Sequence, residues 1–169
     1  MVKELPVNVI KRKIDTNCSP SEALDSFLNY LGAELECTRI YLFKKNEFRH
    51  YDCVVEWYTD ATYPKKDLLQ DLNPAICAPY YSYFRRGEML MVRNIEDLKH
   101  TDSKLYEILL PQELNSFMAG QLVFDGKDLG FFGIDNPNPE KFDELSLVVE
   151  LSSYYAAALL YAQEFPRSI

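Results

Sequence analysis

Residues 130–144, which read GFFGIDNPNPEKFDE, contain a strand-like run that turns directly into a helix. The Asn-Pro-Asn-Pro sequence at 136–139 prevents further strand pairing, because proline lacks an amide hydrogen and restricts the residue before it. Asp143 is a suitable N-cap for the segment that follows, and Phe142 can act as a hydrophobic staple. A helix is therefore predicted from about 144 to 163, so the fold must combine strands and helices.

An earlier helix is predicted to start after Ser19. Ser19 can cap it, Pro20 suits the first helical position, and Glu22 completes a capping box. Gly32 lies near the expected end. The apolar residues at helical spacing form one stripe, and they are Leu24, Phe27, Leu28, Leu31 and Leu35.

Residues 37–58 change to an alternation with a period of two, around the polar segment KKNE, and predict a β-hairpin. In its second strand, one face is expected to carry Tyr51, Cys53, Val55 and Trp57. A second hairpin is predicted to join residues 115–124 to residues 129–136 at Asp125-Gly126, a pair that favours positive φ in tight turns.

The middle of the chain is less regular. Residues 59–74 form a connection longer than compact domains usually need, which predicts a lid or binding loop, or else a loosely packed one. Pro79 is placed in the first turn of a short aromatic helix. A short strand at 89–95 follows, and then a second short helix that Asp102 caps.

The predicted last helix carries two apolar stripes about 100° apart, which one sheet surface cannot easily cover. The stripes are Leu145, Val148, Tyr155, Leu159 and Ala162, and Leu147, Leu151, Tyr154, Ala158, Tyr161 and Phe165. We infer that the second stripe meets the first helix or a partner chain. Burial within the monomer is an equally good interpretation.

The composition excludes several partners. The chain has 18 Lys and Arg against 26 Asp and Glu, a formal charge of −8, which disfavours nucleic acid and anionic membranes. The start lacks a secretory signal pattern, and Glu150 interrupts the most apolar segment, so membrane insertion is not expected. The four cysteines are widely spaced, as in buried cytosolic thiols, and predict a cytoplasmic location.

Familiar catalytic and metal-binding motifs are absent from the sequence. His50 and His100 are isolated, so neither a metal cluster nor a catalytic base is expected. The segment GKDLG from Gly126 joins two predicted strands rather than a strand and a helix, which favours a hairpin over a phosphate loop. No catalytic residue and no metal ligand is predicted, and no motif implies a particular cofactor.

Aromatic residues around the long loop suggest a small-ligand pocket, since such pockets are mostly apolar with a few polar groups. Arg93 is the best of the arginines for an anionic ligand, because it lies on a predicted strand. The predicted ligand-binding residues are Tyr41, Trp57, Tyr80, Tyr81, Phe84, Arg93 and Phe117. The alternative is a tyrosine-rich core with ordinary surface charges.

Three segments of the sequence resemble GAF domains of bacterial signalling proteins. EWYTDATYPKKDLLQDL, from Glu56, is similar to a GAF loop with proline, aspartate and Leu-Gln. YFRRGEMLMVRNIEDL is similar to the stretch in which an aromatic helix ends in Arg-Gly-Glu. GFFGIDNP followed by FDELSLV is similar to the last GAF strand and its turn into the terminal helix. As a set, these segments identify the chain as GAF-like.

The resemblance implies an α/β (α+β) fold: a six-stranded antiparallel sheet with the terminal helices on one face, and short helices and a long loop on the other. It also implies a sensory domain at residues 19–165, between an N-terminal arm or strand at 1–18 and a tail at 166–169. Such domains commonly lie beside GGDEF diguanylate cyclase, EAL or kinase output domains. Neither a bilin attachment motif nor a nucleotide signature is recognisable in this chain.

Three functional hypotheses follow. The first is a non-catalytic sensor that binds a small ligand and relays it through its terminal helices, as a homodimer, to a fused or partner output domain. The second is a ligand-free dimerisation or structural module. The third is a thiol-dependent methionine sulfoxide reductase, for which Cys53 would have to be exposed and reactive.

Overall fold

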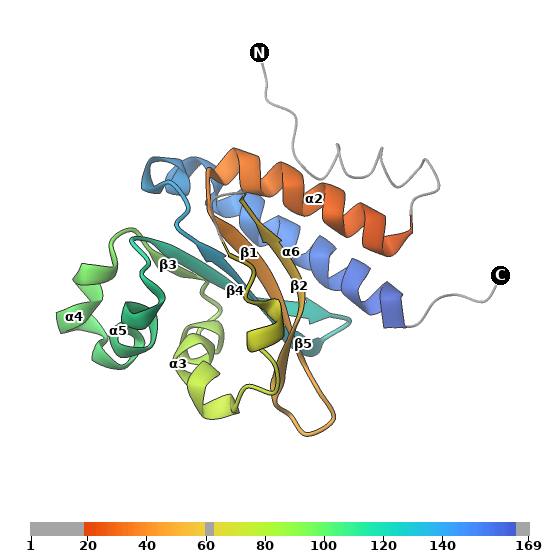
Figure 1. Cartoon of the computed structure of the whole chain (residues 1–169), viewed down its shortest axis with the longest axis horizontal. Coiled ribbons are helices and arrows are strands. Elements are labelled where there is room, and N and C mark those ends of the chain that lie inside the picture. Colours follow the sequence, from red (N-terminus) through yellow and green to blue (C-terminus); the bar gives the residue numbers. More distant parts are fainter. Residues whose placement is uncertain (1–18, 60–62, 165–169) are drawn as a thin grey trace, which may run out of the picture.

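The computed structural model describes residues 19–59 and 63–164, and it contains one antiparallel sheet with helices on both faces (Figure 1). In the described residues the sheet has five strands, in the order β2-β1-β5-β4-β3. The strands are β1 (Arg39–Lys45), β2 (Tyr51–Tyr58), β3 (Leu90–Val92), β4 (Phe117–Phe124) and β5 (Lys127–Asp135). Both predicted hairpins and the mixed fold class are confirmed. The predicted N-terminal arm or strand at 1–18 lies outside the described residues, and the predicted six strands are one more than the described part contains.

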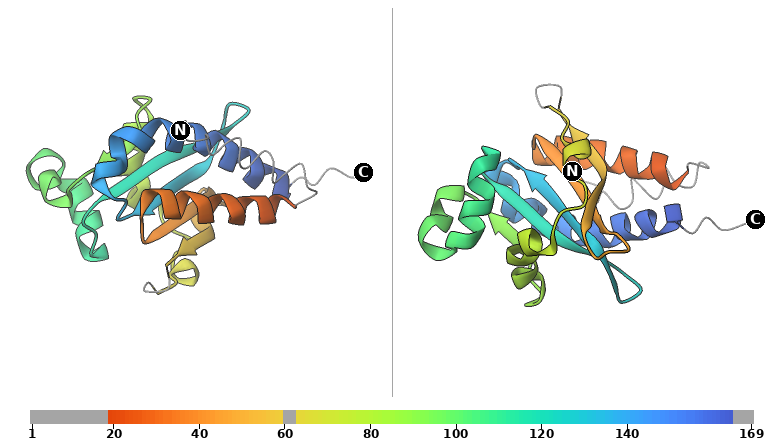
Figure 2. Two further views of the ribbon diagram at one scale, coloured as in Figure 1. Left: turned by 90° about the horizontal axis from the view of Figure 1, so that it is seen from above. Right: turned by 60° about the horizontal axis from the view of Figure 1, so that its bottom comes forward.

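The two long helices cover one face of the sheet, as predicted. The helices α2 (Pro20–Leu35) and α6 (Phe142–Glu164) run beside each other in both views of Figure 2. The predicted capping box at Ser19 is present, with the side chains of Ser19 and Glu22 each bonded to the other residue's backbone amide. Both helices share one apolar core with the strands beneath them. Between the helices, the rings of Phe27 and Tyr155 pack edge to face at 6.2 Å.

The predicted second stripe of α6 divides between two environments. Tyr161 stacks on Phe124 of β4 at a centroid distance of 4.6 Å, whereas Tyr154 is 57% exposed. Among its described residues, the stripe is therefore half-buried where Tyr161 packs against the sheet, and it faces outward at Tyr154. No helix in the described ranges is both long and apolar enough to cross a bilayer.

Short helices cover the opposite face of the sheet. They are α3 (Pro74–Phe84), α4 (Leu98–Thr101) and α5 (Ser103–Leu109), with the 3₁₀ turns η1 (Lys66–Leu68), η2 (Ile95–Asp97) and η3 (Leu110–Gln112). The predicted start of a helix at Pro79 is wrong. Asn73 caps α3 by accepting from the Ala75 amide, and Pro74 occupies the first turn, so Pro79 lies inside the helix. Asp102 caps α5 as predicted.

A β-bulge in the first hairpin changes which side chains face which helices. Leu42 is opposite Val55, but the next residue, Phe43, is opposite Cys53, so Val54 is an extra residue in β2. Tyr51 and Cys53 consequently belong to the core under α3, while Val55 and Trp57 pack against the core under α2 and α6. The predicted single face is wrong, because strict alternation fails at the bulge.

The strand-to-helix junction ends β5 through the backbone of Asn136. This residue is left-handed, with φ 54°, and its amide donates to the Ser116 carbonyl at 3.0 Å. Its side-chain oxygen accepts from the Asn115 amide at 2.7 Å. A 3₁₀ turn, η4 (Pro139–Lys141), then leads into α6, which begins at Phe142. The helix therefore starts earlier than predicted, and Asp143 lies in its first turn instead of capping it.

Candidate functional site

A pocket of about 210 Å³ lies between the sheet and the short helices. Strands β1 and β5 provide one wall, α3 and the end of α5 provide another, and residues 65–72 close a third side. The lining residues are Arg39, Tyr41, Phe43, Lys65, Leu69, Leu72, Ile76, Cys77, Tyr80, Ile108, Gln112, Phe131 and Asp135. Most of this surface is apolar, and the charged side chains are Arg39, Lys65 and Asp135.

Aromatic rings form the apolar side of the pocket. Phe43 and Phe131 come from neighbouring strands and stack with centroids 4.8 Å apart, and Tyr80 from α3 lies 5.5 Å from Phe131. Gly133 makes room for the ring of Tyr41, because a Cβ atom at position 133 would lie 2.3 Å from Tyr41 Cε2. The small residue thus sets the position of one pocket side chain.

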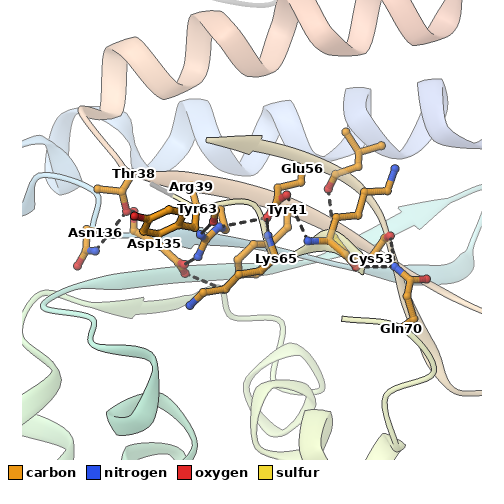
Figure 3. A network of polar contacts seen from close by, with 12 residues as sticks. Thr38, Arg39, Tyr41, Cys53, Glu56, Tyr63, Lys65, Gln70, Asp135 and Asn136 are labelled. Atoms are coloured by element: carbon orange, nitrogen blue, oxygen red, sulfur yellow. Dashed lines mark hydrogen bonds and ion pairs between the residues drawn. The ribbon is translucent and has the colours of Figure 1, made fainter. Parts of the chain in front are cut away.

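The polar side of the pocket is a buried ionic network centred on Arg39 (Figure 3). The Arg39 Nε atom lies 3.2 Å from Glu56 Oε2, and its Nη1 atom lies 3.2 Å from Asp135 Oδ2. Tyr41 donates its hydroxyl to Asp135 Oδ1 at 2.6 Å. Arg39 is 4% exposed and Asp135 is 2% exposed, so these charges are satisfied by one another rather than by bulk water.

Burial dominates the protonation behaviour of this network. Loss of water raises the pKa of the Asp135 carboxyl group, while the hydrogen bond from Tyr41 and the charge of Arg39 act in the opposite direction. Burial and the neighbouring Asp135 carboxylate raise the pKa of Tyr41 well above its ordinary value. Tyr41 therefore remains a neutral phenol that donates to Asp135.

The same network anchors the long loop after β2. Glu56 accepts hydrogen bonds from the backbone amides of Lys65 at 2.8 Å and Lys66 at 3.3 Å. Arg39 donates through Nη2 to the Tyr63 carbonyl. Farther along, Gln70 donates to the Cys53 carbonyl at 2.9 Å. The loop is thus tied to the sheet at the pocket wall, and it brings the Lys65 side chain to the pocket.

The structure brings together most of the predicted aromatic residues, although only Tyr41 and Tyr80 line this pocket. Phe117 packs against Tyr80 at 5.8 Å in the same core. Tyr81 and Phe84 lie farther along α3 and contact Phe131 at 6.1 and 6.5 Å. Phe117, Tyr81 and Phe84 therefore pack against pocket-lining rings without lining the pocket themselves.

Two predicted residues lie elsewhere. The bulge puts Trp57 on the opposite face, where its Nε1 donates to Asn29 Oδ1 of α2 at 2.7 Å. Arg93 lies at the surface, where its guanidinium donates to the Pro139 carbonyl at 3.0 Å and to Asp143 at 2.5 Å. Arg93 therefore holds the start of α6 rather than lining the pocket.

Sequence reasoning missed the charged pocket residues Arg39, Lys65 and Asp135. Asp135 stands in the GFFGIDNP segment and Arg39 starts β1, so antiparallel pairing of these two strand ends would have predicted their contact. Lys65 gave no comparable signal, because it lies in a loop without periodicity.

The described thiols are buried and unpaired. Burial raises the pKa of Cys37, Cys53 and Cys77 to about 12 in each case. A thiol with a raised pKa is a poor nucleophile near neutral pH. No group of three or more His, Cys, Asp or Glu side chains in the described residues has a spacing suited to a metal ion.

No protein-family model and no curated protein matches the sequence, but solved structures match the fold closely. The GAF domain of a phosphoenolpyruvate-protein phosphotransferase from Acinetobacter superposes with a TM-score of 0.67 at 15% identity, over 97% of this chain and 95% of that one. The chain has the GAF fold.

Two further GAF structures match across nearly their whole length. GAF3 from Slr1393 of Synechocystis sp. PCC6803, in its photoproduct state, gives a TM-score of 0.64 at 15% identity, over 88% of this chain and 100% of that one. A GAF domain/HD domain protein from Geobacter sulfurreducens gives 0.63 at 15% identity, over 90% and 99%. The pocket described above therefore lies within a GAF fold.

Proposed function

We propose that this chain is a non-catalytic GAF sensory domain that binds a small ligand in the pocket between β1, β5 and α3. The observation that supports the proposal most directly is the pocket itself, which combines an apolar aromatic wall with a buried ionic network at one end. Small-molecule sites typically combine apolar walls with a few convergent polar groups.

The size of the pocket restricts the ligand. Pockets for drug-sized ligands usually measure about 300–1,000 Å³, whereas this one measures about 210 Å³. A related GAF structure, JSC1_58120g3, is described with bound biliverdin IXa. For this chain we propose a much smaller ligand than a tetrapyrrole.

Binding would reach the terminal helices through the end of β5. Asp135 lines the pocket, and its carbonyl accepts from the Thr38 amide at 3.0 Å. Three residues later, the Asn138 amide donates to the Leu35 carbonyl at the end of α2, at 2.9 Å. A ligand that binds one arrangement of these contacts more tightly would shift the helix packing toward that arrangement.

We further propose that the domain works as a homodimer through α2 and α6, and that it regulates a fused or partner output domain such as a diguanylate cyclase. A ligand-free structural module is the second candidate, because Phe84, Tyr81 and Phe117 fill much of the space around α3. The buried Cys53 thiol, with its raised pKa, does not favour the reductase hypothesis.

Native mass spectrometry of gently purified protein tests the ligand proposal. We expect an extra bound mass in the wild type, lost in Ile76→Trp, which fills the pocket, and kept in Leu110→Trp, where the side chain is half exposed and outside the lining. A wild-type protein without a retained mass, whose melting temperature is also unchanged by a metabolite extract, would favour the structural module instead.

A further inference from the structure

We propose that the pocket ligand is a small monocarboxylic acid with an apolar or aromatic body, recognised by Lys65 and Arg39. This inference rests on the proposed ligand-binding function and specifies the chemistry of its site. It follows from the charges that line the pocket, from the donors still available there, and from the apolar surface opposite them.

The charges that face the pocket favour an anion. Arg39, Lys65 and Asp135 line it, which gives two positive groups and one negative group. Glu56 is not part of the lining, although its carboxylate contacts the Arg39 Nε atom and binds the loop amides. Arg39 is thus already compensated by two carboxylates, and Lys65 is the positive group in the lining that a ligand carboxylate would pair with.

The hydrogen-bonding groups of Asp135 and Arg39 also favour an anionic ligand over a cationic one. Both Asp135 oxygens already accept a hydrogen bond, Oδ2 from Arg39 and Oδ1 from Tyr41. Asp135 is therefore poorly placed to bind an ammonium group of a ligand. Arg39, in contrast, has five N–H donors: Nη1 donates to Asp135 and Nη2 to the Tyr63 carbonyl, while the buried Nε lies 3.2 Å from Glu56 Oε2 without forming a hydrogen bond.

Lys65 is the more accessible of the two cationic groups. In the part of the chain that the structure describes, no carboxylate lies within ion-pair distance of its ammonium group, and the side chain is half-buried at the pocket wall. Its backbone amide is fixed by Glu56 at 2.8 Å, so the residue is held beside the pocket before a ligand arrives. A charge-assisted bond from this position needs little further ordering.

The rest of the pocket suits an apolar body. The stacked rings of Phe43 and Phe131 form one surface, and Leu72, Ile76 and Cys77 form others. Burial of an apolar body increases affinity, but it does so equally for an acid, an amide and an amine of the same shape. The class of ligand is therefore decided at the charged end.

Titration calorimetry on the full chain with phenylacetate, phenylacetamide and phenethylamine tests the inference, because the three probes share one ring and differ in their polar end. We expect phenylacetate to bind about tenfold more tightly than the amide, and the amine to bind most weakly. The series is repeated with hexanoate, hexanamide and hexylamine, so that the shape of one body does not decide the result.

Two lysine variants provide the matched comparison. Lys65→Gln should reduce the affinity for either acid about tenfold, to that of the amide, and leave amide binding unchanged. Lys66→Gln, at the next position but outside the pocket lining, should change neither. Equal binding of acid and amide, or an unchanged acid affinity in Lys65→Gln, would overturn the acid-specific site and leave the pocket proposal standing. If no probe of either series binds at millimolar concentration, the acid-specific inference fails, whereas the ligand proposal is decided by the retained mass in the native mass spectrum.

Discussion

Arg39 lies between two buried carboxylates, those of Glu56 and Asp135, and it also binds a loop carbonyl. At the scale of single residues, this arrangement makes the stability of the fold depend on Arg39. A buried ion pair adds little net stability when it is complete, but losing one partner leaves an uncompensated charge in a medium that solvates it poorly.

We therefore predict that Arg39→Met lowers the free energy of unfolding by about 3–5 kcal/mol, measured by urea denaturation. The matched control is Arg86→Met, because Arg86 pairs with Glu88 at the surface, where both side chains are more than half exposed. That change should stay within about 0.5 kcal/mol. Equal losses in the two variants would show that the buried network is not important for stability.

Single residues also show where sequence reasoning succeeded and where it failed. Tyr41 and Tyr80, two of the predicted ligand-binding residues, line the pocket, and their binding of a ligand stays a prediction. Trp57 was assigned to the wrong face because of one extra residue, Val54, and no local signal marks that bulge. The contact between Arg39 and Asp135 joins residues 96 positions apart, so only the strand order reveals it.

The packing of α2 on β2 depends on a glycine. A Cβ atom at Gly32 would lie 2.3 Å from the Trp57 ring, and the same ring is bonded to α2 through Asn29. The absence of a side chain at one helix position therefore allows an indole to lie against the helix. The sequence showed Gly32 only as a residue near the helix end, and its packing role became visible once the bulge had turned Trp57 toward it.

At the scale of this element, we predict that Gly32→Ala destabilises the protein. The overpacking cost is about 1–3 kcal/mol, against a gain in helix propensity of about 1 kcal/mol. Urea denaturation of a double-mutant cycle with Trp57→Leu isolates the contact. In the Trp57→Leu background the same glycine substitution should become neutral or stabilising, and a cost that persists there would contradict the proposed packing.

For other elements, the local sequence either predicted the bounds of a helix or strand correctly or misled the prediction for a physical reason. The capping box of α2 and both hairpins were predictable, because each depends on residues close in sequence. The start of α3 was not, since Asn73 and Pro74 and the later Pro79 offered two start signals, and the first one determines the helix. The end of β5 was predicted from the prolines of the Asn-Pro-Asn-Pro sequence, and the left-handed Asn136 gives its geometry.

At the scale of the whole molecule, α6 presents the exposed Tyr154 on its outer side, 57% accessible, and this residue belongs to the stripe expected to contact a partner. An exposed aromatic side chain suits an interface between copies of the chain. We predict a mass of twice 19.7 kDa in light scattering at micromolar concentration.

Tyr154→Glu should convert that dimer to a monomer, because it places a charge in the contact. Tyr63→Glu is the matched control, since Tyr63 is also strongly exposed but lies in the loop after β2. Its variant should remain dimeric. A wild-type protein of monomer mass, or equal effects of the two substitutions, would argue against helix-mediated dimerisation.

The central position of β5 in the sheet also determines when the complete sheet can form during synthesis. In the described residues β5 is the last strand, yet it joins the β1–β2 hairpin to β4 and β3, and it supplies the Asp135 carboxylate at the pocket. A nascent chain that ends before residue 127 has two separate halves of a sheet and no common partner for them. Such non-local closure is expected to be slow relative to local helix and hairpin formation. The complete lining of the pocket is therefore present only after β5 has been synthesised.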